Sequence, residues 1–170
     1  YGYIRSGKYC EATPYLRQSI AKAPRDTGIV VTLFNLSVCF NNCKLYDSAT
    51  AVYREILQID PKNADALNGM GRYFSQLGRY AADSVRAADE AKNEAAKKGF
   101  EAAKNQALDS AGAYFKQAFE VNPSDVDAAG QLGLIEYIRG DYKAALAPFV
   151  KSTELDPKNT EYHTSVGDCY

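Results

Sequence analysis

Four prolines in this sequence follow similar residues at related intervals. They end the segments AKAP, QIDP, EVNP and ELDP, at Pro24, Pro61, Pro123 and Pro157. The intervals between successive prolines are 37, 62 and 34 residues. Self-similarity at a period of about 20–50 residues is typical of repeat proteins, in which each unit buries its apolar face by stacking on its neighbours. The chain is therefore expected to fold as a stack of similar units.

The last interval, residues 124–157, contains the clearest unit. Its sequence Gly-Asp-Tyr at 140–142 predicts a turn between two segments of helical periodicity. Before the turn, the residues that share one side are Leu132, Gly133 and Tyr137. After the turn, small and apolar residues at spacings of four and three form one helix face, namely Ala145, Phe149 and Ser152. Pro157 then ends the second helix, because proline cannot continue the hydrogen-bond ladder.

The same arrangement recurs in the other intervals. The second helices are expected to bury Ala12, Leu16 and Ser19, then Ala49, Tyr53 and Ile56, then Ala111, Phe115 and Ala118. The first helices match more loosely, through Leu36, Ser37 and Phe40, through Met70, Gly71 and Phe74, and through Val166, Gly167 and Tyr170. This pattern resembles the tetratricopeptide repeat family, in which W-x2-L-G-x2-Y is followed by A-x3-F and then P, at a period of about 34 residues.

The resemblance implies an all-α fold, a right-handed α-solenoid of tetratricopeptide helix-turn-helix repeats with a helical insertion in one repeat. The expected organisation is one domain over 1–170, with a partial repeat at 1–24, repeats at 25–61, 62–123 and 124–157, and a partial repeat at 158–170. No copy has the family's Trp, and Lys44 replaces the turn glycine of the second unit. Because the chain begins and stops part-way through a repeat, we expect it to be part of a longer chain or a larger complex.

An inserted helical arm is expected at about 79–106, within the repeat 62–123. The insertion is dominated by Ala, Lys, Glu and Asp, a composition that favours helix. Between residues 86 and 106, Phe100 is the only large apolar side chain. Small residues recur every seven positions and predict close packing of two helices, namely Ala81, Ala88 and Ala95, and Ala96 and Ala103.

The arm is expected to be a hairpin, since lengthening both helices of the repeat preserves the direction of the stack. Such an arm would protrude by roughly 20 Å. Equal helix lengths favour a turn at Asn93, whereas turn chemistry favours Gly99. The alternatives are a local turn at Gly78 with an extra helical or irregular segment, and a single long helix.

The cysteines do not form a recognised metal motif, and the sequence has a single histidine. No C-x-x-C pair occurs among Cys10, Cys39, Cys43 and Cys169. Because a zinc site needs about four suitable ligands, we expect no metal site and interpret the cysteines as buried small residues. A disulfide between Cys10 and Cys43 is an alternative, so the redox compartment stays open.

Composition and charge exclude several classes of function. The chain has 20 basic and 21 acidic residues, so no overall field would steer it to nucleic acid. No apolar run approaches the roughly 18 residues of a membrane-spanning helix. Neither a nucleophile–base pair nor a glycine-rich phosphate loop is recognisable. The sequence therefore predicts no enzyme activity, no cofactor and no direct membrane span, and it leaves localisation open between cytoplasm and periplasm.

The resemblance implies that the first helices line a concave face that binds a protein or an extended peptide. The residues expected there are Phe34, Asn35, Val38, Asn41, Asn42, Asn68, Arg72, Gln76, Gln131, Leu134 and Tyr137. Side-chain amides both donate and accept hydrogen bonds, so they suit a peptide backbone. On the arm, the residues expected to contact a partner are Arg86, Glu90, Lys97 and Phe100. The alternative is that both sets are merely exposed.

Some tetratricopeptide domains bind the acidic C-termini of chaperones through basic side chains on successive first helices. Those domains combine the basic residues with asparagines, and Asn35 matches one asparagine slot. The other positions hold no basic residue, namely Phe34, Val38, Asp65, Gly69, Asp127 and Gln131. Without cations, the carboxylates of such a tail would be desolvated and unpaired. Chaperone tails are therefore not expected as partners.

The leading functional hypothesis is a non-catalytic protein–protein interaction scaffold. It would bind a peptide or a partner subunit through the concave face, the arm or both. One alternative is a structural subunit of a large multiprotein or envelope-associated assembly. A further alternative is a regulatory repeat segment of a larger enzyme.

Overall fold

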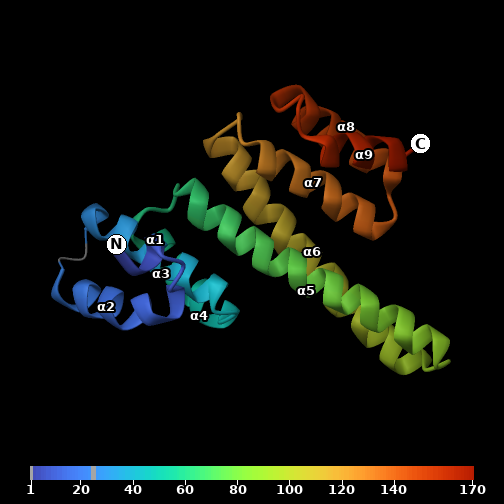
Figure 1. Ribbon diagram of the computed structural model, residues 1–170. Helices are drawn as coiled ribbons and strands as arrows, with labels where there is room; N and C mark the ends of the chain where they lie inside the picture. The colour runs from blue at the N-terminus through green and yellow to red at the C-terminus, as the bar shows by residue number, and fades with distance from the viewer. Residues whose placement is uncertain (1, 24–25) are drawn as a thin grey trace. The chain divides into compact units, whose positions relative to one another are not determined.

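The computed structural model describes residues 2–23 and 26–170, and within those ranges every regular element is a helix (Figure 1). The elements are α1 (Gly2–Arg5), α2 (Tyr9–Lys22), the short 3-10 helix η1 (Thr27–Ile29), α3 (Val30–Asn42), α4 (Tyr46–Ile59), α5 (Ala64–Glu90), α6 (Glu94–Val121), α7 (Val126–Arg139), α8 (Tyr142–Leu155) and α9 (Thr160–Asp168). The all-α fold class is therefore confirmed. Contacts divide the chain into an N-terminal unit, residues 1–70, and a C-terminal unit, residues 71–170.

In the N-terminal unit, α3 packs against both α2 and α4. The core is built from side chains that are almost fully buried, among them Leu33, Cys39 and Ile56. The predicted faces of α3 and α4 are buried, whereas in α2 Ser19 is exposed and Ile20 is buried in its place. The prediction for Ser19 was wrong because the buried face of α2 runs one position further along the helix.

A disulfide joins Cys10, in the first turn of α2, to Cys43, which follows α3, with the two Cα atoms 5.7 Å apart. The interpretation of these two cysteines as buried small residues is therefore wrong, and the alternative pairing is the one present. Cys39 is free and buried, as that interpretation expected, and Cys169 is free and half-buried. In the described ranges no group of three His, Cys, Asp or Glu side chains could hold a metal ion.

The turns between paired helices use left-handed residues. Gly140, which ends α7, has φ 82°, a conformation that glycine adopts without a steric penalty. Lys44 occupies the equivalent turn between α3 and α4 and has φ 60°. The departure from the family pattern at Lys44 therefore leaves the turn conformation intact but imposes it on a residue with a Cβ atom.

In the C-terminal unit, α7 packs against α6 and α8, and α8 packs against α9. The second-helix faces predicted at 111–118 and 145–152 are buried, with Ala111, Phe115 and Ala145 completely so. Asp125 caps the start of α7, since its carboxylate accepts a hydrogen bond from the backbone N–H of Ala128 at 3.0 Å. This cap satisfies one of the free donors in the first helical turn.

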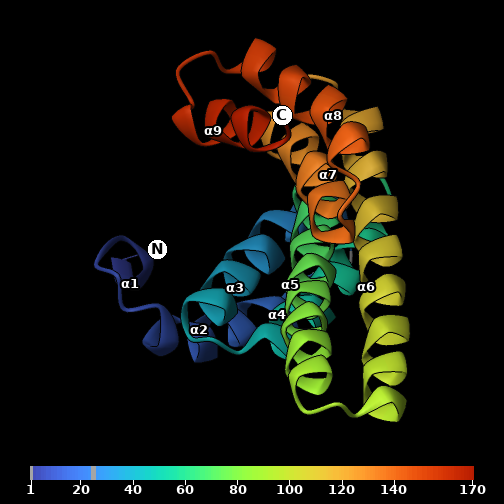
Figure 2. The same ribbon diagram turned by 90° about the vertical axis from the view of Figure 1, so that its right-hand side faces the viewer.

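The insertion is part of two long helices that form a hairpin (Figure 2). α5 continues without interruption through Gly78, which is buried rather than in a turn. A Cβ atom at this position would lie 2.6 Å from the side chain of Leu108 on α6. Gly78 therefore allows the two helices to approach closely, and the alternatives of a local turn at Gly78 and of a single long helix are wrong.

The turn of the hairpin lies between Glu90 and Glu94, at the position favoured by equal helix lengths. Lys92 adopts a left-handed conformation with φ 54°, and Asn93 caps α6 by accepting a hydrogen bond from the N–H of Ala96 at 3.1 Å. A turn at Gly99 was the wrong prediction, because Gly99 lies inside α6.

Only some of the alanines predicted to lie between the two helices of the arm are buried there. Near its base, the rings of Phe74 and Tyr114 stack with their centroids 5.8 Å apart. Toward the turn, Ala88 is buried as predicted, but Ala95 and Ala103 are exposed. The heptad pattern therefore identifies the contact face of α5 but not that of α6.

Candidate partner-binding groove and arm

The residues expected on the concave face come from three first helices. α3 carries Phe34, Asn35, Val38, Asn41 and Asn42; α5 carries Asn68, Arg72 and Gln76; and α7 carries Gln131, Leu134 and Tyr137. The residues up to Asn68 belong to the N-terminal unit and the others to the C-terminal unit. Only Arg72 and Asn42 are exposed, and the remaining members of the set are half-buried.

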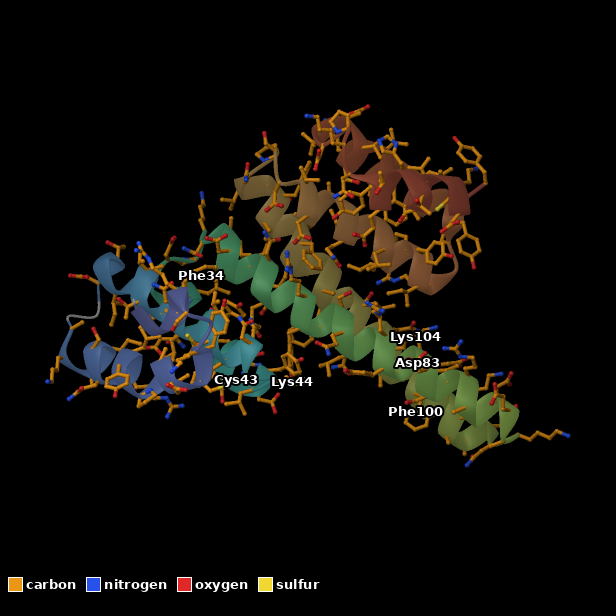
Figure 3. All side chains as sticks on the ribbon, in the orientation of Figure 1. Phe34, Cys43, Lys44, Asp83, Phe100 and Lys104 are labelled. Carbon is orange, nitrogen blue, oxygen red and sulfur yellow. A yellow bond between two sulfur atoms is a disulfide. The ribbon has the colours of Figure 1, made fainter. Side chains whose placement is uncertain are left out.

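Two of the asparagines on α3 make hydrogen bonds within the N-terminal unit. The Asn41 side-chain amide donates to the hydroxyl of Tyr53 on α4 at 2.8 Å, so it joins the two helices of one repeat. The Asn42 amide donates to the backbone carbonyl of Val38, also at 2.8 Å. Both side chains therefore have structural hydrogen bonds that the sequence pattern did not predict. Phe34, half-buried on the same helix, is labelled in Figure 3.

In the C-terminal unit, residues of α5 and α7 line one groove with a volume of about 380 Å³. Four predicted residues meet there, namely Arg72, Gln76, Gln131 and Leu134. Four other lining residues were not predicted, namely Ser75, Arg79, Tyr80 and Asp83. The last three were assigned to the arm, although their spacing of three, four and seven residues from Gln76 would have indicated the same helix face. Tyr137 does not line the groove, and its ring packs edge-on against Tyr142 with a centroid distance of 5.1 Å.

Most of the polar groups in this groove are paired within the protein. The guanidinium of Arg72 donates to one carboxylate oxygen of Asp127, from Nη2 at 2.6 Å and from Nε at 3.1 Å. The amide of Gln76 donates to the Tyr80 hydroxyl at 2.8 Å. The Asp83 carboxylate forms an ion pair with Arg86, one helical turn along α5. Arg86, expected to contact a partner, is therefore already paired with a neighbour.

Two side chains of the groove have polar groups that make no hydrogen bond or ion pair with the described residues. The side chain of Arg79 is exposed, and within the described part of the chain its guanidinium has neither a hydrogen bond nor an ion pair. The same holds for the half-buried amide of Gln131 on α7. Beside them, the ring of Tyr80 is 59% exposed. The groove therefore offers an unmatched positive charge, an amide and an aromatic surface.

The distal part of the arm is polar. Lys97 on α6 donates to the carboxylate of Asp89 on α5 at 2.5 Å, and this hydrogen bond together with the Asp89 charge raises the pKa of Lys97. Glu90, at the end of α5, is exposed. Phe100 is 40% exposed, and Figure 3 shows its ring projecting away from the hairpin. Of the four predicted arm residues, Phe100 and Glu90 are open to a partner, and Lys97 and Arg86 are paired.

None of the described helices is long and apolar enough to cross a membrane.

Two family models, both described as tetratricopeptide repeat, match residues 31–63 and 97–160. The chain belongs to the tetratricopeptide repeat family. The matched segments contain α3 from its second residue, all of α4, most of α6, and all of α7 and α8. They leave α5, the first helix of the arm, outside both matches.

A curated relative of the chain is the cellulose synthase operon protein C of Pseudomonas fluorescens (strain SBW25), with 27% identity over 160 residues. The match covers 91% of this chain and 10% of the relative. The chain therefore spans about a tenth of the length of that protein.

Solved structures with a similar fold are also tetratricopeptide proteins. The MamA RS-1 ArsTM double mutant has a TM-score of 0.72 at 18% identity, over 98% of this chain and 76% of MamA. The first tetratricopeptide domain of Spaghetti (RPAP3), bound to the HSP90 peptide SRMEEVD, has a TM-score of 0.61 at 15% identity, over 85% of this chain and 92% of that one. At these identities the likeness shows the fold alone, and it confirms the predicted α-solenoid class.

Proposed function

We propose that the chain is a non-catalytic interaction scaffold that binds an extended segment of a partner protein in the groove between α5 and α7. The family supports a protein–protein interaction scaffold in general. The observation that carries the specific proposal is the meeting of Arg72, Gln76, Gln131 and Leu134 in one groove. The arm then provides a second surface, at Phe100 and Glu90.

The groove has the size and the chemistry for such a segment. Its volume of about 380 Å³ falls in the range of about 300–1,000 Å³ that is typical of ligand sites. The amide of Gln131 can donate to a peptide carbonyl and accept from a peptide N–H. Leu134 and the ring of Tyr80 provide apolar surface for side chains of the bound segment. An extended backbone therefore meets both its polar and its apolar requirements here.

Selection from a displayed library of random linear peptides tests this proposal. Peptides that bind the chain should lose affinity when Leu134→Asp places a charge in the groove. The matched control is Lys143→Asp, at an exposed position on α8 outside the groove. Circular dichroism of both variants verifies the fold. Selected peptides that bind the Leu134→Asp variant as well as the unaltered chain would contradict the proposal.

A second candidate function is a structural repeat segment of a large, envelope-associated assembly. The disulfide between Cys10 and Cys43 favours it, because disulfides persist mainly in oxidising compartments. The small share of the relative's length that the chain matches agrees with a segment of a larger protein. Alkylation of thiols in intact cells, followed by mass spectrometry, should find Cys10 and Cys43 protected and Cys169 modified. Full modification of Cys10 would contradict this candidate.

A further inference from the structure

We propose that the arm completes the groove and makes it selective for an extended partner segment that carries one internal acidic side chain, bound by Arg79. The inference rests on the proposed function, since it names the class of segment that the same groove takes. It starts from one juxtaposition. Arg79 and Tyr80, at the base of the arm, line the same groove as Gln131 of the neighbouring first helix, α7.

The arm is the reason that these side chains lie on a helix in the groove. The corresponding helix α7 ends at Arg139 and turns at Gly140, whereas α5 passes Gly78 and continues to Glu90. The charged and amide residues that α5 contributes follow at spacings of four, three and four, which is one helix face, namely Arg72, Gln76, Arg79 and Asp83. A compact turn at Gly78 would end this face before Arg79. The insertion therefore adds a cation and an aromatic ring to the groove.

The charges of the groove leave one cation unmatched. Asp127 neutralises Arg72, and Arg86 neutralises Asp83. Arg79 has no such partner among the described residues. A carboxylate from the partner would therefore form a new ion pair in the groove without breaking an existing one.

The chemistry of Arg79 favours a carboxylate. The planar guanidinium matches two carboxylate oxygens with two parallel N–H donors, and such charge-assisted hydrogen bonds are among the stronger ones in proteins. A basic segment would instead bring like charges together. An acidic C-terminal tail would bring at least two carboxylates to one unmatched cation and leave a charge uncompensated. A single acidic side chain inside an extended segment therefore fits best.

The first part of the test measures the acidic preference itself. Peptides selected from the random linear library on the full 170-residue chain should share an Asp or Glu at a fixed position. A selected peptide is then synthesised in two forms, one with this residue and one with the corresponding Asn or Gln. Fluorescence anisotropy at low salt should give a dissociation constant about tenfold higher for the neutral form, and this ratio should fall as salt is added. Equal affinities of the two forms would overturn the inference.

The second part assigns the preference to Arg79. The Arg79→Gln variant should bind the acidic and neutral peptides with the same affinity, whereas the control Lys143→Gln should keep the tenfold ratio. Retention of the full ratio by Arg79→Gln would overturn the inference. So would a selection dominated by peptides whose binding needs a free C-terminal carboxylate.

The Leu134→Asp variant separates the failure of this inference from the failure of the proposed function. Peptides that depend on Leu134 but show no acidic preference would overturn the inference and leave the proposed function standing. Failure to select any peptide that depends on Leu134 would contradict both.

Discussion

At the residue scale, two features of this chain bear on its stability. Lys44, in the turn between α3 and α4, adopts the left-handed conformation that Gly140 adopts in the turn between α7 and α8. Tyr162, on α9, covers Gly130 of α7, where an added Cβ atom would lie 2.1 Å from the tyrosine ring. The first feature is visible in the sequence as a missing turn glycine. The second is not, because the contact joins two different repeats.

We predict that Lys44→Gly stabilises the chain. A residue with a Cβ atom in the left-handed region costs roughly 1–2 kcal/mol, and glycine removes that cost at the expense of a more flexible unfolded chain. The expected net gain in the free energy of unfolding is about 0.5–1 kcal/mol, measured by urea denaturation. The control Lys116→Gly, at an exposed position inside α6, should lose about 1 kcal/mol. A loss of stability on Lys44→Gly would contradict the observed turn.

We predict that Tyr162 makes the C-terminal unit sensitive to alkaline pH. Burial, with a further contribution from the charge of Asp127, raises the pKa of Tyr162 from 10.0 to about 12. The folded state holds the Tyr162 proton more tightly than the unfolded state does. The contribution of this group to the free energy of unfolding is therefore fully present below pH 10 and is lost as the pH rises toward 12. The melting temperature should therefore fall more between pH 9 and 11.5 for the unaltered chain than for Tyr162→Phe. Equal falls would contradict this role.

At the scale of elements, the sequence was most informative where helical periodicity repeats. The buried faces of α4, α6 and α8 follow from the spacing of small and apolar residues. The hairpin follows from the requirement that the stack keep its direction, and equal helix lengths gave its turn. Turn propensity alone pointed to Gly99, but Lys92 and the Asn93 cap form the turn instead.

The candidate site could be predicted only in part, because the interior partners of polar residues are set by packing. Gln131 and Leu134 were identified from their place on a first helix, and they line the groove. Arg79 and Tyr80 were assigned to the arm, since the sequence does not show how far α5 continues the groove. Asn41 has the right residue type for a peptide site, but its hydrogen bond to Tyr53 depends on the packing of α3 on α4.

We predict that the distal arm can be shortened without loss of the fold. Deletion of residues 84–90 and 94–100 removes seven residues from each helix. Seven residues are close to two full helical turns, so nearly the same faces of α5 and α6 still meet. Glu101 then follows Asn93 as Glu94 does now, within the same Glu-Ala-Ala-Lys sequence. Because Ala88 is the only buried residue removed, far-UV circular dichroism should show intact helices and the melting temperature should change little.

The same variant tests which part of the arm serves the groove. It keeps Arg79, Tyr80 and Asp83, but it removes Arg86, the ion-pair partner of Asp83. The freed carboxylate, four residues from Arg79, should weaken the binding of acidic peptides, whereas the neutral form of a groove peptide should bind with unchanged affinity. It lacks Phe100, so any partner that needs the exposed ring of the distal arm should no longer bind. Loss of folding would show that the distal arm belongs to the core and would contradict the account given for it.

At the scale of the whole molecule, the chain is a tetratricopeptide scaffold in which one repeat has lengthened into an arm. The repeat family supports a general role in protein–protein interaction. What distinguishes this chain is that α5, which the family models leave unmatched, supplies both the arm and one wall of the groove. The partner is therefore expected to recognise features that an unmodified repeat lacks.

The most direct test of this account is the NMR titration of an isotope-labelled chain with a peptide selected for binding. Backbone amide shifts should change mainly in residues 72–83 of α5 and 131–134 of α7, the two stretches that line the groove. The Leu134→Asp variant should show no such changes. Shift changes confined to α8 and α9, with α5 and α7 unaffected, would contradict the central claim that the groove between α5 and α7 binds the partner.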